Sequence, residues 1–259
     1  MKIAIIGAGN MGGAIARGLA KGSIIPTDAL WVANPSAGKL DALKREFPEI
    51  HTTHSNAEAA AEAQLVILAV KPWLMASVCR EIEWSACQMI ASVAAGISME
   101  QLQAMTQTSG KPIFRIVPNT AISLGSSMTL IAASGSTTEQ EQWIISLFQE
   151  MGIAMLIPEA KIAATTAMTS CGIAYALKYI QAAMQAGIEL GVYPKDGMKM
   201  VAQSMKGAAE LILQNETHPS VEIDKVCTPG GITIKGINTL EHEGFSSALI
   251  KAIKASCPS

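Results

Sequence analysis

Short apolar runs alternate with amphipathic segments through the first half of the chain. Two runs, Lys2–Ile6 and Gln64–Val70, are almost continuously apolar, which is typical of parallel strands buried on both faces. Further strands are predicted at Ala29–Ala33, Met89–Val93, Ile113–Val117, Met128–Ala132 and Ala154–Leu156. Helices are predicted at Asn10–Lys21, Gly38–Phe47 and Glu139–Met151. The alternation predicts an α/β fold with a doubly wound sheet.

The pattern changes at Glu159, where clear strand signals stop. Helices are predicted near 160–190, 195–215 and 232–255. Between Ile162 and Leu190 the only charged side chains are Lys178 and Glu189. A helix that is apolar nearly all round is buried on most sides. We therefore place a domain boundary at residue 158, with an α/β domain over 1–158 and an all-helical dimerisation domain over 159–259.

Composition supports an association surface. Hydrophobic residues make up 49% of the 259 residues and charged residues 15%, with a mean hydropathy of +0.31. A soluble monomer of this size usually carries more charge. We expect part of the apolar surface to be buried between subunits, in a homodimer or higher homo-oligomer formed through the C-terminal helices. The alternative is a chain that is simply rich in alanine and methionine.

Charge and cysteine usage exclude several classes of partner. The net charge of -2 argues against nucleic acid or an anionic membrane surface as a partner. No stretch approaches the roughly 20 uninterrupted apolar residues of a transmembrane helix. The cysteines are scattered without metal-site spacing, as a reducing cytosol allows: Cys79, Cys87, Cys171, Cys227 and Cys257. The four histidines also lack the spacing of metal ligands, so we expect no metal site. The scattered cysteines and the lack of a transmembrane stretch predict a cytoplasmic protein.

A glycine-rich motif follows the first predicted strand. It fits G-x-G-x-x-G, with the residues Gly7, Ala8, Gly9, Asn10, Met11 and Gly12. Glycine clusters also form ordinary turns, but this one follows a strand and opens a helix, the context of a dinucleotide site. Gly7 permits the tight turn, Gly9 lets the backbone approach a diphosphate at the helix N-terminus, and Gly12 permits close packing. The motif predicts a Rossmann-like domain and an oxidoreductase that uses a nicotinamide cofactor.

The end of the second strand predicts the choice of dinucleotide. NAD-binding domains usually place Asp or Glu there, against the ribose 2′-hydroxyl. This chain has Asn34, so no carboxylate repels a 2′-phosphate, which Ser36 or Lys39 can contact. The alternative is that Asn34 and Pro35 form a simple turn and Lys39 is a solvated helix residue. We predict NADPH as the cofactor, with NADH as the alternative.

Four further segments carry a family resemblance. They read AVKP at Ala69–Pro72, SVAAG at Ser92–Gly96, RIVPNT at Arg115–Thr120 and TPGGITI at Thr228–Ile234. Together they resemble pyrroline-5-carboxylate reductase, a family that makes proline by reducing a cyclic imine with NAD(P)H. The resemblance runs from Lys2 to about Leu240. Its most specific parts are AVKP and the late PGG-x-T sequence.

The resemblance implies roles for individual residues. Gly7–Gly12 would hold the diphosphate, Asn34 with Ser36 the adenosine ribose phosphate, and Asn56 would lie beside the adenine ribose. Residues at the strand ends would line the cofactor: Ala69, Val70, Lys71, Pro72, Ala94 and Ala95. The substrate would be received in the helical half by Gly230, Gly231, Ile232 and Thr233. Glu159 matches an acidic position close to the ligand.

These residue types suit the implied chemistry. The PGG-x-T segment offers backbone N–H groups to a carboxylate, and its glycines let a ring approach closely; the alternative is an ordinary turn between helices. Thr233 is the candidate to orient the imine nitrogen. Glu159 would stabilise a cationic iminium by Coulomb attraction, unless it is a solvated residue opening a helix. Thr233 and Glu159 are therefore the predicted catalytic residues.

The sequence departs from the family pattern at four positions. Ser170 and Ile173 stand where the family usually has a glycine and a proline, and Lys225 stands where some members have an asparagine. Ile232 replaces a smaller residue beside the substrate. These departures bear on cofactor preference and on the fit of the substrate ring, rather than on the type of reaction.

The function implied is reduction of 1-pyrroline-5-carboxylate to L-proline by hydride transfer from NAD(P)H, the last step of proline biosynthesis. One alternative is a β-hydroxyacid dehydrogenase. Such enzymes have a helix lysine followed four residues later by asparagine, whereas here Lys178 is followed by Ala182. Another is a catalytically silent, nucleotide-binding oligomer, against which the intact PGG-x-T segment speaks. The expected partners are a small cyclic imine and further copies of the chain.

Overall fold

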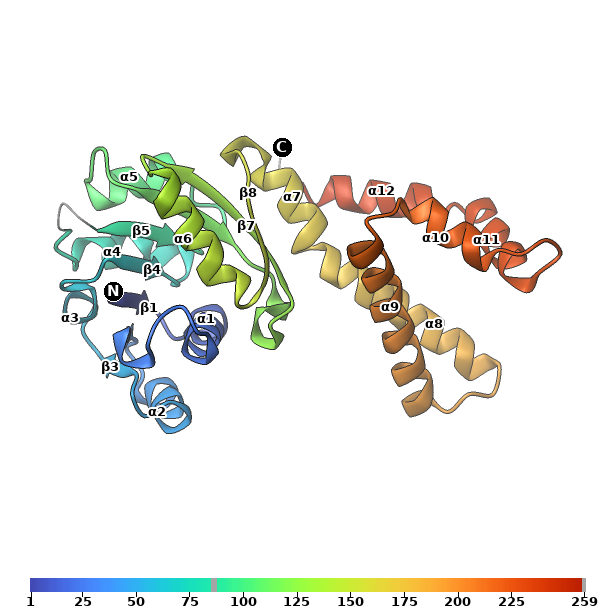
Figure 1. Cartoon of the computed structure of the whole chain (residues 1–259), viewed down its shortest axis with the longest axis horizontal. Coiled ribbons are helices and arrows are strands. Elements are labelled where there is room, and N and C mark those ends of the chain that lie inside the picture. The colour runs from blue at the N-terminus through green and yellow to red at the C-terminus, as the bar shows by residue number, and fades with distance from the viewer. Residues whose placement is uncertain (85–87, 258–259) are drawn as a thin grey trace. The chain divides into compact units, whose positions relative to one another are not determined.

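An eight-stranded sheet organises residues Met1–Ser170, the first of two compact units (Figure 1). The computed structural model describes residues 1–84 and 88–257. The strand order is β3-β2-β1-β4-β5-β6-β7-β8, and every neighbouring pair is parallel except β6 with β7. The strands are β1 (Ile3–Ile6), β2 (Leu30–Ala33), β3 (His51–Thr53), β4 (Leu65–Leu68), β5 (Met89–Ser92), β6 (Ile113–Val117), β7 (Ser127–Ser134) and β8 (Gly152–Leu156).

Two apolar cores lie on opposite faces of this sheet. Ile3 and Ile5 of β1 pack on one face and Ala4 and Ile6 on the other, because side chains alternate along a strand. The first core is covered by α1 (Asn10–Lys21), α2 (Ala37–Glu46) and α6 (Thr138–Gln149). The second is covered by α3 (Asn56–Ala60), α4 (Met75–Arg80) and α5 (Met99–Thr106). The predicted doubly wound α/β sheet is confirmed.

The unit Met1–Ser170, called the sheet unit below, extends past the predicted boundary at residue 158. It includes α7 (Ile162–Thr169), where Ile162 is buried against Leu130 and Ala132 of β7. Short 3-10 helices complete the unit: η1 (Thr27–Ala29), η2 (Pro72–Leu74), η3 (Thr120–Leu124) and η4 (Glu159–Lys161).

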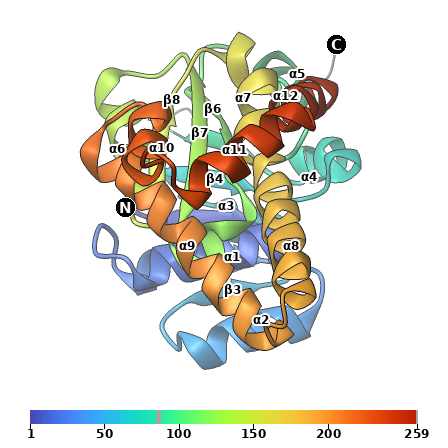
Figure 2. The same ribbon diagram turned by 90° about the vertical axis from the view of Figure 1, so that its right-hand side faces the viewer.

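Residues from Cys171 onward, called the helical unit, form five helices in the described part of the chain. They are α8 (Gly172–Glu189), α9 (Pro194–Asn215), α10 (Pro219–Val226), α11 (Ile232–His242) and α12 (Phe245–Ala255). Figure 2 shows α8 and α9 as a hairpin of long helices lying side by side. Pro194 occupies the first turn of α9, where its missing N–H has no intrahelical acceptor to lose.

Several predicted element boundaries are wrong. The helix predicted over 160–190 is broken, because α7 ends at Thr169 and α8 begins at Gly172. The helix predicted over 232–255 is divided at Gly244, whose φ of 79° lies in the left-handed region. The short helix α10 and strand β3 carry too few apolar positions for periodicity to reveal them.

The helical unit has no buried apolar core of its own. Among described residues 171–257, Gly197 alone is buried. Large apolar side chains are exposed on several of its helices and loops, with Leu190 84%, Tyr193 79% and Ile232 86% exposed. Exposed apolar surface on this scale marks an association surface in soluble proteins. The structure therefore places the predicted association surface in this unit.

No helix within residues 1–84 and 88–257 combines the length and apolar character needed to cross a membrane.

Candidate functional site

The glycine loop packs directly against the end of β4. Gly7 has φ +103°, and a Cβ there would lie 2.6 Å from the Ala69 carbonyl oxygen. At Gly12 a Cβ would lie 1.9 Å from the Gly7 oxygen. At Gly9, in contrast, a Cβ would meet no atom within 4 Å. The loop is therefore closely packed at Gly7 and Gly12 and open at Gly9.

The N-terminus of α1 is free to bind an anion. Its N-cap is Gly9, and neither a side-chain cap nor an acidic residue is present in its first turn. The first N–H groups of an α-helix have no intrahelical acceptor and carry a partial positive charge. An uncapped helix N-terminus beside open space is suited to a diphosphate.

Asn34 joins the end of β2 to the glycine loop. Its side chain is 7% exposed, and its Oδ1 accepts a hydrogen bond from the Ala8 N–H at 3.0 Å. Its Nδ2 donates to the backbone oxygen of Ser36 at 3.1 Å and to the Ser36 Oγ at 2.9 Å. Both ends of the Asn34 amide are thus used within the protein. Because the Ser36 Oγ accepts from Asn34, its own hydroxyl proton remains available to a ligand.

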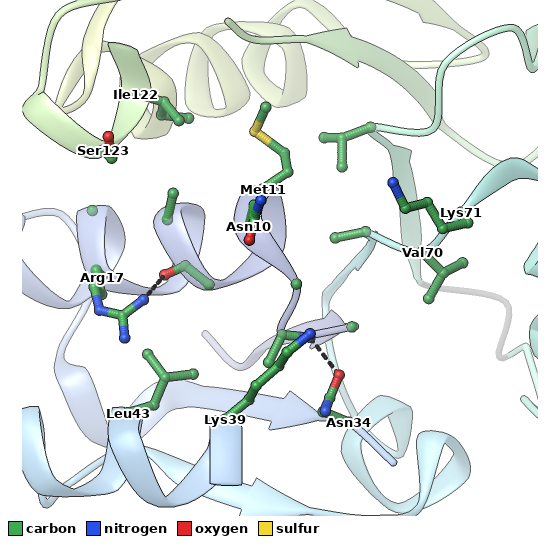
Figure 3. A pocket seen from close by; sticks show the side chains of 18 of the residues that line it. Asn10, Met11, Arg17, Asn34, Lys39, Leu43, Val70, Lys71, Ile122 and Ser123 are labelled. Atoms are coloured by element: carbon green, nitrogen blue, oxygen red, sulfur yellow. Dashed lines mark hydrogen bonds between the residues drawn. The ribbon is translucent and has the colours of Figure 1, made fainter. Parts of the chain in front are cut away.

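These elements surround one groove at the carboxyl ends of the strands, with a volume of about 1610 Å³ (Figure 3). This exceeds the roughly 300–1,000 Å³ of ordinary small-molecule pockets, so an extended dinucleotide fits. Figure 3 shows side chains from α1, α2, η3 and the ends of β2 and β4 around this space. Most of the predicted cofactor residues line the groove: Gly7, Ala8, Gly9, Asn10, Met11, Asn34, Asn56, Ala69, Val70, Lys71, Pro72, Ala94 and Ala95. Gly12 and Ser36 lie beside it through the contacts above.

The cations around the groove differ in their partners. Arg17 Nε lies 2.6 Å from Glu46 Oε2, and this hydrogen bond holds the pKa of Glu46 below its ordinary value. Lys21 lies 3.6 Å from the same carboxylate. Lys71 Nζ lies 5.9 Å from the centre of the Trp73 ring. Lys39 has no hydrogen bond or ion pair with the residues that the structure describes. Lys39 is therefore the cation best placed to respond to an added anion.

Two parts of the groove were missed by the sequence analysis. One is η3 with Gly125, which lines the groove after the predicted RIVPNT strand end. The other is His54, whose Nδ1 lies 2.9 Å from the Asn34 backbone oxygen. The spacing of His54 two residues before Asn56 was the available signal, but a single histidine in a polar loop has no periodicity or motif to identify it.

The residues predicted for the substrate lie in the helical unit, at the start of α11. Gly230 has φ +72°, and Gly231 is the N-cap of α11 with no side-chain cap. Ile232 and Thr233 open the helix, and the Thr233 hydroxyl makes no hydrogen bond within the described residues. This helix N-terminus offers free N–H groups, as the PGG-x-T segment predicts.

Glu159, the other predicted catalytic residue, is paired within the sheet unit. Its Oε1 accepts from the Met99 N–H at 2.8 Å and from Arg115 Nη1 at 3.2 Å. Met99 begins α5, shortly after Ala94 and Ala95. Glu159 thereby ties the start of α5 to η4, and Arg115 neutralises much of its charge.

The described residues hold no metal-binding cluster, and the thiol of Cys79 is buried. Within residues 1–84 and 88–257, no three His, Cys, Asp or Glu side chains are grouped so as to hold a metal ion. Burial raises the pKa of the Cys79 thiol to about 11, so it stays protonated and unreactive at neutral pH. Cys87 lies outside the described residues.

A parallel sheet with a glycine loop, an uncapped helix N-terminus and a groove at the strand ends defines a Rossmann-type dinucleotide-dependent oxidoreductase. Comparison with known proteins narrows this class. Residues 2–96 match the family model described as NADP oxidoreductase coenzyme F420-dependent, and residues 159–258 match pyrroline-5-carboxylate reductase dimerisation. The second match, together with the exposed apolar surface of the helical unit, supports assembly of the chain into a homo-oligomer.

Relatives that match over nearly the whole chain are also pyrroline-5-carboxylate reductases. Pyrroline-5-carboxylate reductase 1 of Dictyostelium discoideum is 36% identical, over 98% of this chain and 48% of that protein. The enzyme of Escherichia coli (strain K12) is 34% identical, over 97% of this chain and 94% of that protein. The Plasmodium falciparum pyrroline carboxylate reductase, solved with NADP bound, has a TM-score of 0.86 at 26% identity, over 99% and 95% of the two chains. The chain belongs to the pyrroline-5-carboxylate reductase family.

Two alanine substitutions separate the packing role of the loop from its binding role. Gly12→Ala should lower the free energy of unfolding by about 1–3 kcal/mol, because the added Cβ overlaps the Gly7 oxygen. Gly9→Ala should change it by less than about 0.5 kcal/mol and yet weaken NADP⁺ binding about tenfold, because the methyl group enters the open side of the loop. Thermal unfolding and fluorescence titration measure the two effects. Wild-type NADP⁺ affinity in Gly9→Ala would contradict this role.

Proposed function

We propose that this chain reduces 1-pyrroline-5-carboxylate to L-proline with NADPH as the hydride donor. The proposal rests on two uncapped helix N-termini in this chain, which belongs to the family. That of α1 lies on a groove large enough for a dinucleotide, and that of α11 lies at the PGG-x-T segment. NADPH, when bound, supplies the hydride. The chain's own residues bind and orient the cofactor and the substrate, and they exclude water from the site.

The groove favours NADPH over NADH. Asn34 replaces the carboxylate that would repel a 2′-phosphate, and its amide positions Ser36 through two hydrogen bonds. The Ser36 hydroxyl can donate to that phosphate, and Lys39 supplies an uncommitted positive charge. Asn34 itself is a positioning residue, because its own donors and acceptor are already used. The family model over residues 2–96 and the NADP-bound relative from Plasmodium falciparum support this assignment.

The start of α11 is proposed to receive the substrate carboxylate. Backbone N–H groups at a helix N-terminus bind an anion without a buried cation. The left-handed backbone at Gly230 turns the chain into α11, and the absence of a side chain there lets a small ring approach. Ile232 supplies an apolar wall beside it, being 86% exposed in the isolated chain.

Little acid–base machinery is required, because a protonated imine already carries the positive charge that attracts hydride. Alignment of the reacting carbon is the main task of the protein. Thr233 is proposed to hydrogen-bond the ring nitrogen and so fix its orientation. Glu159 is proposed to act by holding the start of α5 near Ala94 and Ala95, since Arg115 reduces the charge that it can offer to an iminium.

The direct test follows NADPH and NADH absorbance with purified protein and 1-pyrroline-5-carboxylate. The control assays supply NADP⁺ or NAD⁺ together with 2-hydroxy or 3-hydroxy acids, because an alcohol is oxidised only by the oxidised cofactor. We expect NADPH to be oxidised with the imine, faster than NADH, and neither NADP⁺ nor NAD⁺ to be reduced with the hydroxy acids. Turnover of a hydroxy acid without turnover of the imine would sink the proposal in favour of a β-hydroxyacid dehydrogenase. Nucleotide binding without turnover of any substrate would instead indicate the silent oligomer.

Substitution of Thr233 tests its orienting role. Thr233→Ala should lower kcat about tenfold, the value of one hydrogen bond of about 1.4 kcal/mol, while the Kd for NADP⁺ changes less than about twofold. Thr233→Ser retains the hydroxyl and should recover most of the rate. A parallel loss of cofactor affinity in Thr233→Ala, or no rescue by serine, would show that Thr233 does not act on the substrate.

We also propose that the assembly is a homodimer or a higher oligomer built from homodimers, joined through the helical unit. The described part of this unit has no buried apolar core within one chain, and residues 159–258 match the family model for pyrroline-5-carboxylate reductase dimerisation. Light scattering should show at least a dimer at micromolar concentration. A monodisperse monomer that unfolds cooperatively would refute it. The cytoplasmic location expected from composition stays a prediction.

A further inference from the structure

Glu81 lines the groove with a carboxylate that the proposed function does not use. It follows α4 and shares this part of the groove with Asn56, which opens α3. Its Oε2 accepts a hydrogen bond from Asn56 Nδ2 at 2.6 Å. Its Oε1 has no hydrogen bond or ion pair with residues 1–84 and 88–257. A carboxylate oxygen only accepts hydrogen bonds, so Oε1 is available to a donor on a ligand.

The sheet places Glu81 at the adenosine end of the groove. A dinucleotide with its diphosphate at the start of α1 meets the end of β2 with its adenosine ribose. β3 is the next strand beyond β2, and Asn56 begins α3 shortly after it. The hydrogen bond from Asn56 therefore holds the Glu81 carboxylate beyond the ribose region. Ala94 and Ala95 follow β5, on the other side of β1, where the nicotinamide half would lie.

One face of η2 and α4 forms the wall beside this carboxylate. Leu74, Ser77, Val78 and Glu81 follow one another at helical spacings of three and four residues, and all four line the groove. Ser77 is already engaged, because its hydroxyl donates to the Leu74 carbonyl at 2.8 Å. The wall therefore offers the apolar side chains of Leu74 and Val78 to the flat face of a base and a hydrogen-bond acceptor to its polar edge.

The other carboxylate among the described groove residues is engaged by the backbone. Glu150 accepts from the N–H groups of Ser23 and Ile24 through its Oε1. The remaining charged side chains that line the groove are cations: Arg17, Lys21, Lys39 and Lys71. Glu81 is therefore the acidic group on the groove that is best placed to recognise a donor on the ligand.

We propose that Glu81 is a specificity-determining residue, which selects the adenine base of the cofactor by accepting a hydrogen bond from its 6-amino group at Oε1. The inference rests on the proposed use of this groove for NADPH. Adenine carries an amino donor at position 6, whereas hypoxanthine and guanine carry an oxygen that a carboxylate repels. Oε2 stays on Asn56, which leaves the Asn56 Oδ1 to accept from a ribose hydroxyl. A purely structural link between α3 and α4 would give no preference among bases.

Binding of two cofactors that differ in the base tests the proposal. Isothermal titration of the full-length chain gives the Kd for NADP⁺ and for its deamino analogue, nicotinamide hypoxanthine dinucleotide phosphate. Both carry the same diphosphate and 2′-phosphate, so contacts with these groups cancel in the ratio of the two constants. In the wild type the deamino analogue should bind about tenfold more weakly, the value of one hydrogen bond to a charged group.

Glu81→Gln is the matched variant. Its amide oxygen can still accept from Asn56, while its amide nitrogen now donates toward the base, so the tenfold preference should fall to equal binding or reverse. Glu81→Ala removes both oxygens and should bring the two constants within about twofold of each other, which gives a second variant should the first unfold. Glu83→Gln is the control, because Glu83 is exposed and does not line the groove. It should keep the wild-type ratio.

The outcomes separate this inference from the proposed function. Equal binding of both nucleotides by the wild type, or a preference that persists in both Glu81 variants, would overturn the role of Glu81 and leave NADP⁺ binding intact. Loss of the preference in Glu83→Gln as well would assign it to the segment as a whole and likewise overturn the role. A preference that depends on Glu81, without turnover of 1-pyrroline-5-carboxylate, would support the inference and remove the proposed substrate. Absence of NADP⁺ binding in the wild type would overturn both.

Discussion

The close approach of the backbone at the ends of β1 and β4 is the constraint on which the site depends. Gly7 and Gly12 leave no room for a Cβ, so α1 begins directly against Ala69. This contact aims the free N–H groups of α1 at the groove and leaves Gly9 as the open point of the loop. A side chain at Gly7 or Gly12 would move the N-terminus of α1 away from the position expected for a diphosphate. It would also widen the groove, which has the size of a dinucleotide.

Asn34 extends this constraint to the second strand. Because its Oδ1 accepts from Ala8 and its Nδ2 donates to Ser36, Asn34 holds the glycine loop and the end of β2 in one register. His54 adds a third strand end through the backbone of Asn34. A small hydrogen-bonded network therefore joins the glycine loop to the ends of β2 and β3 beside the groove.

The helical unit differs from the sheet unit in that its described part has no buried apolar core within one chain. Its helices expose leucine, isoleucine and methionine side chains that a stable isolated domain would bury. In the proposed assembly, burial of this surface between copies of the chain would supply the missing apolar stabilisation and so couple folding of this unit to assembly. The segment at the start of α11, proposed above to receive the substrate, belongs to the same unit.

The sequence alone determined the α/β class, the strands with continuous apolar runs and the glycine loop, because burial on both faces and the geometry of a tight turn leave direct marks on residue type. It also indicated the family through AVKP and PGG-x-T. Only the tertiary structure decided that Asn34 hydrogen-bonds the glycine loop, that Arg115 pairs with Glu159 and that His54 lines the groove. Those roles depend on contacts between residues far apart in the chain, which local periodicity does not record. The breaks at Ser170 and Gly244 were hidden for a related reason, since the apolar pattern continues across them; at Gly244 a left-handed backbone angle divides the helices.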